Sequence, residues 1–261
     1  MAAMGSPKEA NFTGEAMVAM LLFSIASSSL LLVNKLVLHH IPAPSIVSSV
    51  QFACSVVFAV LAMATGLVPP DPFEWRKAKP YLLYVGMFVA TIYCNMKALQ
   101  HSNVETIIVF RACCPLVVSV IEWSFMGRQL PSARSSLALL ALLGGSIGYV
   151  LTDRAFKMSG WGAYAWVTAY FLIISVEMVY GKHIVGPPLG FASMWGPTLY
   201  TNSISLPPMM AIGWLTREQD RLVSADWSLP AIALLGVSCV LGNPSLSLGL
   251  TLAFAFAPPQ I

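Results

Sequence analysis

Charged residues are scarce in this 261-residue chain, making up only 10% of it, whereas soluble globular proteins average about 25%. Hydrophobic residues account for 57%, and the mean hydropathy is +0.75. Nowhere do polar residues run long enough to form a soluble domain. The composition therefore predicts an integral membrane protein in contact with lipid, and the net charge of +3 is too small to indicate a nucleic-acid partner.

Motifs for metal or covalent chemistry are also lacking. The five cysteines fall inside apolar runs without the spacing of a metal site or a redox pair. His39 and His40 follow an apolar run with no further ligand at a metal-binding spacing. No nucleophile–base set, phosphate-binding loop or zinc-protease motif occurs. The sequence predicts no metal, no cofactor and no enzymatic activity.

Apolar runs of helical length dominate what is present. A window of about nineteen residues places membrane spans at Met17–Leu38, Ser45–Leu67, Tyr81–Leu99, Thr106–Phe125, Ser135–Leu151, Tyr164–Tyr180, Phe191–Leu215 and Leu229–Leu250. The linkers are short, and several contain proline, which favours turns between helices. The sequence predicts an all-α polytopic fold.

Basic residues in the linkers indicate the orientation of the chain. If the N-terminus is cytosolic, seven basic linker residues lie on the cytosolic side and four on the other side. Cytosolic loops carry the excess of lysine and arginine in membrane proteins. The count favours a cytosolic N-terminus.

Arg111 lies in the middle of the fourth span. A charge at this depth costs about 2.5–3.5 kcal/mol on insertion scales, so it must face protein, water or a ligand. Pro115 follows four residues later, which frees a backbone carbonyl and bends the helix near the charge. Two interpretations stay open: Arg111 binds an anionic ligand such as phosphate, or it pairs with an acid on another span, such as Glu177.

Lysines lie near the ends of three other spans. Lys35 lies near the end of the first span and Lys182 follows the sixth. Their similar settings suggest an internal repeat that an odd number of spans would invert, with a substrate site at the repeat interface. Lys97 shares a helical face with Tyr93. Each lysine either lines a cavity or extends toward the membrane surface.

The seventh span contains Tyr200 and Asn202 between Gly196-Pro197 and Pro207-Pro208. In a regular helix the two side chains would point about 200° apart, but the prolines predict an interrupted helix. Discontinuous helices are where transporters build substrate sites. An amide can bond a nucleobase edge and a ring can stack on the base; the alternative for Asn202 is a helix–helix hydrogen bond.

Small and polar residues form stripes on the first two spans. Ser24, Ser27 and Ser28 form the first stripe, and Ser48, Gln51 and Ser55 form the second. Such residues indicate close helix packing, with a second interpretation in which they line a path.

Several motifs together resemble nucleotide-sugar transporters of the plant-type Golgi GDP-sugar group, relatives of the GDP-mannose transporters in the drug/metabolite transporter superfamily. The resemblance rests on Val33-Asn34-Lys35, on Lys97–Thr106 leading into Val109–Leu116, and on Glu177–His183. It covers roughly residues 15–240.

The resemblance implies two inverted five-helix repeats and alternating access, with a cytosolic nucleotide sugar exchanged for a lumenal nucleoside monophosphate. It places Arg111 on substrate phosphate. It also implies that Tyr200 and Asn202 engage the base, since they match two of the four positions of a Phe-Tyr-Asn-Asn signature that reads guanine. Lys35, Lys97 and Lys182 would then set a positive field along the path.

The C-terminal part departs from this pattern. The Gly-Ala-Leu-Asn-Lys signature of the family's ninth span has no counterpart after Gly242. We therefore expect one transmembrane transporter domain with about eight of ten helices: residues 1–155 as the first five-helix repeat, 156–242 as an incomplete second repeat, and 243–261 as a divergent tail.

The sequence as a whole predicts a multi-pass Golgi antiporter that exchanges a GDP-sugar for GMP. Two alternatives stay open. One is a UDP-sugar or sugar-phosphate carrier of the same fold. The other is a truncated, non-transporting isoform that acts by association, for which Gly144-x-x-x-Gly148 supplies a packing face; that face also leaves a homodimer open.

Overall fold

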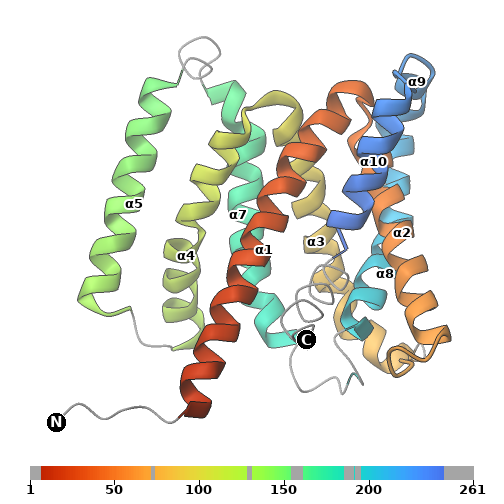
Figure 1. Cartoon of the computed structure of the whole chain (residues 1–261). Coiled ribbons are helices and arrows are strands. Elements are labelled where there is room, and N and C mark those ends of the chain that lie inside the picture. The colour runs from red at the N-terminus through yellow and green to blue at the C-terminus, as the bar shows by residue number, and fades with distance from the viewer. Residues whose placement is uncertain are drawn as a thin grey trace, which may run out of the picture.

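Helices make up all of the regular structure in the described part of the chain. The computed structural model describes residues 7–71, 74–127, 131–153, 161–184, 191 and 195–243. The helices are α1 (Pro7–His40), α2 (Pro44–Ala64), α3 (Trp75–His101), α4 (Val104–Met126), α5 (Ala133–Thr152), α7 (Trp161–Ile184), α8 (Trp195–Leu215), α9 (Glu218–Val223) and α10 (Leu229–Leu241). The long helices lie side by side in an antiparallel bundle (Figure 1).

Each predicted span overlaps one of these helices, which confirms the all-α fold. Within the described residues, five segments are long and apolar enough to cross a membrane: Pro44–Ala64, Tyr81–His101, Val104–Phe125, Ala133–Thr152 and Tyr164–Lys182. The apolar helix α10 is described only through Leu241. Residues 244–250 of the predicted eighth span and all but Asn243 of the predicted tail lie outside the described residues.

Local sequence explains where several helices begin and end. Pro44 lies in the first turn of α2, where its missing N–H costs no helical hydrogen bond. Gly127 follows α4 with φ of 62°, a left-handed conformation that glycine adopts without a steric penalty. The Ser132 hydroxyl accepts a hydrogen bond from the Ser135 amide at the start of α5.

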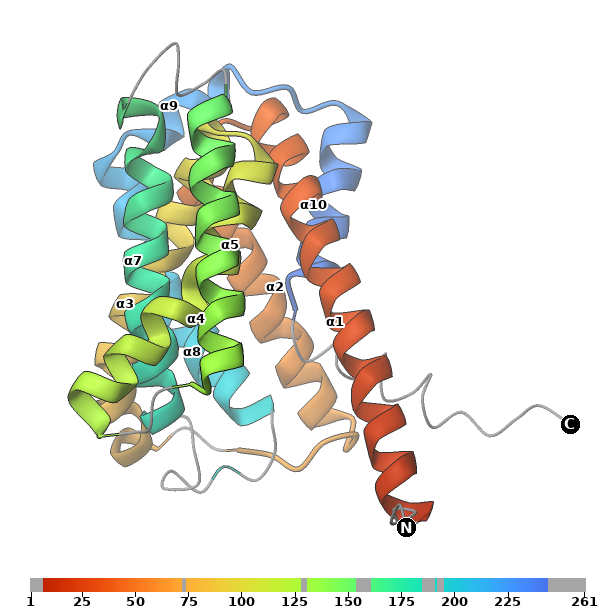
Figure 2. The same cartoon turned by 90° about the vertical axis from the view of Figure 1, so that its left-hand side faces the viewer.

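Helix α8 corrects one sequence-based expectation. It runs without interruption from Trp195 to Leu215 with Pro207 and Pro208 inside it, so the predicted interruption is wrong. Each proline removes one backbone donor, but the flanking hydrogen bonds keep the helix continuous. Likewise α4 continues through Pro115, where the carbonyl of Arg111 loses its helical donor, and Figure 2 shows α4 bent along its length.

Pairing between helices sets the shape of the bundle. Helix α3 packs on α7, α2 on α8, and α1 on α10, while α4 packs on both α7 and α5. Helix α5 lies at one edge of the bundle, and none of its residues is buried. Figures 1 and 2 both place α9 at the end opposite the N-terminus. We call these two ends the α9 end and the N-terminal end.

Apolar packing closes the α9 end. A buried cluster there joins the last turns of α1 and α3 to the first turns of α2 and α4, and it includes Val37, Ile41, Val47, Leu99 and Ile107. The outer faces of the bundle also carry large apolar side chains; Leu137 on α5 and Leu83 on α3, for example, are well exposed. Exposed apolar faces of this kind suit contact with lipid, whereas the polar side chains described next lie inside.

Candidate functional site: a polar cavity beside Arg111

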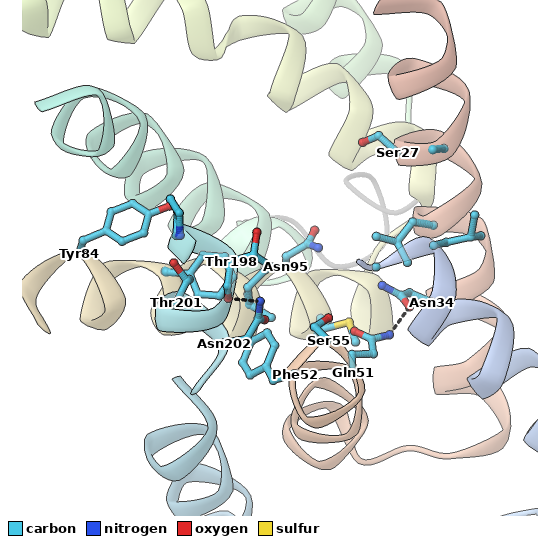
Figure 3. A pocket seen from close by; sticks show the side chains of 18 of the residues that line it. Ser27, Asn34, Gln51, Phe52, Ser55, Tyr84, Asn95, Thr198, Thr201 and Asn202 are labelled. Atoms are coloured by element: carbon cyan, nitrogen blue, oxygen red, sulfur yellow. Dashed lines mark hydrogen bonds between the residues drawn. The ribbon is translucent and has the colours of Figure 1, made fainter. Parts of the chain in front are cut away.

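A cavity of about 380 Å³ lies among α1, α2, α3, α8 and α10. We call it the central cavity. Amide and hydroxyl side chains line it together with aromatic rings: Ser27, Asn34, Gln51, Phe52, Ser55, Tyr81, Tyr84, Phe88, Asn95, Thr198, Thr201 and Asn202. Figure 3 shows most of these side chains around the space. The volume of the central cavity lies within the usual range of small-molecule sites, about 300–1,000 Å³.

A hydrogen-bonded amide network forms one wall of the central cavity. The Gln51 Nε2 group donates to Asn34 Oδ1 at 2.8 Å and to Ser238 Oγ at 3.0 Å. These bonds tie α2 to α1 and α10 and fix the orientation of both amides. Figure 3 shows the bond between Gln51 and Asn34. Within the described residues, the Gln51 carbonyl and the Asn34 amino group have no further partner, so an acceptor and a donor remain for a ligand.

Asn95 adds an unpaired polar atom to the same space. Its Oδ1 is buried and has no hydrogen-bond partner within the described part of the chain. A buried acceptor left unpaired costs about 1–3 kcal/mol. A bound molecule with a donor at this position would remove that cost.

Tyr200 and Asn202 point to opposite sides of α8, as a continuous helix requires. Asn202 lines the central cavity, and its Nδ2 donates to Thr198 O at 2.8 Å. The Tyr200 ring instead packs on Tyr81 and Phe191, with ring centroids 6.3 and 5.2 Å away. The Tyr200 hydroxyl accepts a hydrogen bond from the Glu74 amide at 2.6 Å.

Arg111 lies in a smaller cavity of about 200 Å³ between α1 and α4, which we call the Arg111 pocket. Ile108 lies beside Arg111 on α4, and the α1 wall is formed by Ser24, Ser27, Ser28 and Leu31. Ser27 also lines the central cavity, so the two spaces adjoin at this residue. No acidic side chain among the described residues lies within ion-pairing distance of Arg111.

Glu177, the proposed alternative partner of Arg111, does not pair with it. The Glu177 Oε2 atom is buried and has no hydrogen-bond partner among the described residues.

The polar residues of the stripe on α2 have two kinds of surroundings. Gln51 and Ser55 line the central cavity, whereas the Ser48 hydroxyl donates to Pro44 O at 2.9 Å inside its own helix.

The three predicted lysines lie outside the central cavity. Lys35 and Lys97 line a separate pocket at the α9 end. Lys182 is half-exposed at the N-terminal end, and its Nζ lies 2.6 Å from Glu122 Oε1 on α4. The structure therefore brings Arg111 and Asn202 to adjoining spaces and separates them from the lysines.

Outside the membrane-spanning segments, titratable side chains contact one another at both ends of the bundle. At the N-terminal end, Lys77 Nζ lies 2.9 Å from Glu74 Oε1 and 3.6 Å from Asp71 Oδ1. The hydrogen bond that the Lys77 ammonium donates to the Glu74 carboxylate raises the pKa of Lys77. At the α9 end, the hydrogen bond from His40 lowers the pKa of Asp226.

Several cavity residues did not stand out in the sequence. Asn95, Tyr84 and Phe88 lie on α3 and face α8 and α2 across the central cavity. Their signal is the three- and four-residue spacing of the aromatic Tyr84 and Phe88, the aliphatic Ile92 and the polar Asn95. That spacing marks one helical face.

Comparison with known proteins agrees with the motif-based resemblance. The model of the Triose-phosphate Transporter family matches residues 15–186. A GDP-fucose transporter of Arabidopsis thaliana is 36% identical over 203 residues, which cover 78% of this chain and 58% of that protein. A GDP-mannose transporter of the same plant is 29% identical over 226 residues, which cover 84% and 59%.

A UDP-galactose/UDP-glucose transporter of Arabidopsis thaliana is also similar, at 22% identity over 231 residues, 87% of this chain and 69% of that protein. The chain thus spans a little under 60% of the length of the two GDP-sugar transporters. The family match covers most of the described helices and includes Arg111. The chain therefore belongs to the Triose-phosphate Transporter family and is an all-α, multi-pass membrane protein.

Proposed function

We propose that the protein is a nucleotide-sugar carrier of the Golgi membrane that exchanges a GDP-sugar for GMP by alternating access. One observation carries this proposal: an amide-lined, aromatic-walled cavity adjoins a pocket that holds Arg111, which has no acidic partner among the described residues. A nucleotide has the matching pair of chemistries, a base with hydrogen-bonding edges and a phosphate group. The similarity to two GDP-sugar transporters supports the choice of base.

Each part of the ligand has a wall that suits it. The carbonyl of Gln51, the amino group of Asn34 and the Asn95 carbonyl offer both donors and acceptors to a base edge. Phe88 and Tyr84 provide flat faces on which the base can stack. Arg111 binds the phosphate across Ser27, and its planar guanidinium can make two parallel hydrogen bonds to phosphate oxygens.

The other predicted residues take different roles in this proposal. Asn202 contacts the base from α8, on the cavity side. Tyr200 supports α8 from behind, through its aromatic packing and its bond with Glu74. Lys35, Lys97 and Lys182 lie toward the two ends of the bundle and contribute to the field at the mouths.

Helix pairing supports the division into two repeats, 1–155 and 156–242. Within the described helices, α7, α8 and α10 would then be the first, second and third helices of the second repeat. A twofold relation would exchange the α3–α7 pair with the α1–α10 pair and map the α2–α8 pair onto itself. All three pairs are among the closest in the bundle. Two repeats that rock about the α2–α8 contact would provide alternating access.

Exchange in proteoliposomes tests the proposal. The purified chain is reconstituted with GMP inside, and uptake of labelled GDP-mannose or GDP-fucose is followed. We expect GMP inside to drive uptake, and we expect Arg111→Ala to reduce it at least tenfold, since a charge-assisted bond to phosphate is worth about 1.5–3 kcal/mol. Arg134→Ala removes an exposed arginine at the start of α5 and serves as the matched control.

Competition experiments distinguish a GDP-sugar carrier from a carrier of the same fold that transports another ligand. Inhibition by GMP but not by UMP or inorganic phosphate supports the proposal. Stronger inhibition by UMP would instead favour a UDP-sugar carrier, which the similarity to a UDP-galactose/UDP-glucose transporter makes the second candidate. Normal exchange by Arg111→Ala would refute the role of that residue. A fluorescent fusion that fails to reach the Golgi would refute the location.

A non-transporting role by association is favoured by one observation. Helix α5 has no buried residue, and a side chain added at Gly144 or Gly148 would meet no atom within 4 Å. This small-residue face is therefore open for a second helix, in a homodimer or with a related chain. No flux from the isolated chain, together with crosslinking through α5, would support that role over the carrier.

A further inference from the structure

The pocket at the α9 end has a chemistry of its own. It measures about 380 Å³ and gathers Lys35 of α1, Lys97 and His101 of α3, Arg221 of α9 and His39 of α1. Among the described residues it shares no lining residue with the central cavity. Leu38 and Leu99 of the apolar cluster form part of its wall, so packed side chains separate the two spaces.

The positive charges of this pocket are only partly balanced. Lys97 Nζ lies 4.0 Å from Glu218 Oε1. That buried carboxylate is already bound at the start of α2, where it accepts bonds from the Ser45 amide at 2.7 Å and the Ser45 hydroxyl at 3.1 Å. One acid thus serves both a helix N-terminus and a lysine.

Lys35 and Arg221 have no ion pair within the described residues. The Lys35 ammonium donates to two backbone carbonyls at the end of α3, Leu99 O and Ser102 O, the latter at 2.9 Å. Glu105 on α4 attracts Lys35 electrostatically but forms no salt bridge with it. The Arg221 guanidinium makes no hydrogen bond within the described part of the chain; only the backbone carbonyl of this residue accepts one, from the Ser224 hydroxyl. Three cationic side chains therefore line the pocket, whereas only two acidic side chains among the described residues lie near it. One of these two acids is already bound at the start of α2.

We propose that this α9-end pocket binds a phosphomonoester dianion. A phosphomonoester carries a charge of about −1.5 to −2 at neutral pH on one compact group, which matches the unbalanced charge. Arginine and lysine are the side chains that hold such groups, and the two histidines add donors. The dianion has two sources at a membrane surface: a soluble nucleoside monophosphate or the headgroup of phosphatidate.

The position gives this site a use beyond the transport cavity. It lies at the mouth opposite the N-terminus, outside the apolar cluster that closes the bundle. If the proposed exchange holds, a monophosphate bound here would be concentrated at the mouth through which it leaves or enters. The binding itself does not depend on that function.

Binding to the full chain in phosphatidylcholine nanodiscs tests the proposal, with Arg111→Ala in every sample so that the central phosphate contact is absent. GMP and guanosine are titrated and thermal stabilisation is recorded. We expect GMP to stabilise the protein more than guanosine does, because guanosine lacks the phosphate and can bind only through its base. Adding Arg221→Gln should weaken GMP binding about fivefold, the scale of an exposed ion pair. Arg217→Gln removes an equally exposed arginine from the same connection, outside the pocket, and should leave binding unchanged.

Two further arms complete the test. His101→Gln, which leaves every permanent charge in place, should weaken GMP binding less than Arg221→Gln and guards against misfolding of one variant. Nanodiscs with about one tenth dioleoyl phosphatidate distinguish the two sources of the phosphomonoester. If thermal stabilisation by GMP is lost in these nanodiscs in an Arg221-dependent way, the lipid headgroup is a ligand. If stabilisation by GMP is unchanged, the ligand is the nucleotide. Equal binding of GMP by the Arg221→Gln and Arg217→Gln chains, or equal stabilisation by guanosine, would overturn the site. Loss of exchange alone would count against the carrier and not against this pocket.

Discussion

At the scale of single residues, two neighbours on α8 illustrate how direction along a helix decides role. Asn202 faces the central cavity. Its amino group bonds Thr198, and its carbonyl oxygen has no hydrogen bond within the described residues. Tyr200 is fully packed among Tyr81 and Phe191. Chemical type alone would assign both residues to a nucleobase. Geometry separates them.

We expect Asn202→Ala to weaken GMP binding about tenfold, because one hydrogen bond is worth about 1 kcal/mol and the variant also removes contact area. Tyr200→Phe should leave GMP affinity unchanged and lower the free energy of unfolding by about 1 kcal/mol, because the bond with the Glu74 amide is lost. Titration with GMP and thermal unfolding measure the two effects. If Tyr200→Phe weakened GMP binding as much as Asn202→Ala, our separation of their roles would fail.

Asn95 makes a second prediction at this scale. Its buried Oδ1 is unpaired among the described residues, so the folded protein bears a cost that a ligand removes. Asn95→Leu should therefore weaken GMP binding while leaving stability equal or higher by about 1 kcal/mol. Asn34→Leu is the matched control, since it breaks the formed bond with Gln51 and should lower stability. A loss of stability in Asn95→Leu as large as in Asn34→Leu would show that Asn95 is structural.

At the scale of elements, the start of α8 depends on a close approach. A Cβ atom added at Gly196 would lie 2.4 Å from Asp71 Oδ2 and 2.7 Å from Phe191 Cδ1. Both neighbours must then shift, and Asp71 is also near Lys77 in a buried ion pair. Gly196 therefore links the orientation of α8, and with it Asn202, to the ion pairs at the N-terminal end.

Gly196→Ala should destabilise the protein by about 1–3 kcal/mol, the usual cost of overpacking, and should weaken GMP binding through the displaced helix. Gly144→Ala is the control on α5, where the added atom meets nothing within 4 Å. That variant should be neutral or stabilising by up to about 1 kcal/mol, because alanine favours the helix. Thermal unfolding of both variants decides the point, and equal behaviour would contradict it.

The elements also show what the sequence could reveal. Length and hydropathy located the helices because each apolar run must satisfy its backbone hydrogen bonds within itself. The proline pair of α8 misled the prediction, because a missing donor does not by itself end a helix that neighbours support. Contacts between residues that are far apart in the sequence could not be predicted. Nothing local to Lys182 indicates Glu122, and nothing local to Lys97 indicates Glu218.

In the candidate site, too, local features could be predicted from the sequence and tertiary contacts could not. Arg111 stood out because a charge inside an apolar run is costly, and its pocket with the serines of α1 agrees with that expectation. Asn95 and Tyr84 did not stand out, since an amide or a phenol in a span is ordinary until the facing helix is known. The pairing of α3 with α8 and α2 around one cavity is a tertiary fact.

At the scale of the whole molecule, the bundle is closed at one end and polar toward the other. The apolar cluster of Val37, Val47 and Leu99 fills the α9 end. The central cavity instead reaches Thr198 at the start of α8 and Gly242 after α10, which lie toward the N-terminal end. Alternating access requires such an asymmetry, with one mouth shut while the other admits the ligand.

Thiol labelling from each side of the membrane should detect this asymmetry. In a chain whose five cysteines are replaced by alanine, Thr198→Cys should react with an impermeant maleimide added on the N-terminal side, and GMP should slow the reaction. Val47→Cys, 1% exposed, should react from neither side. The exposed positions Leu67 and Val223, at the N-terminal and α9 ends, provide the matched controls for sidedness as Leu67→Cys and Val223→Cys. Fast labelling of Val47→Cys together with protection of Thr198→Cys would mean that the chain rests with its α9 mouth open, because only separation of the apolar cluster exposes Val47.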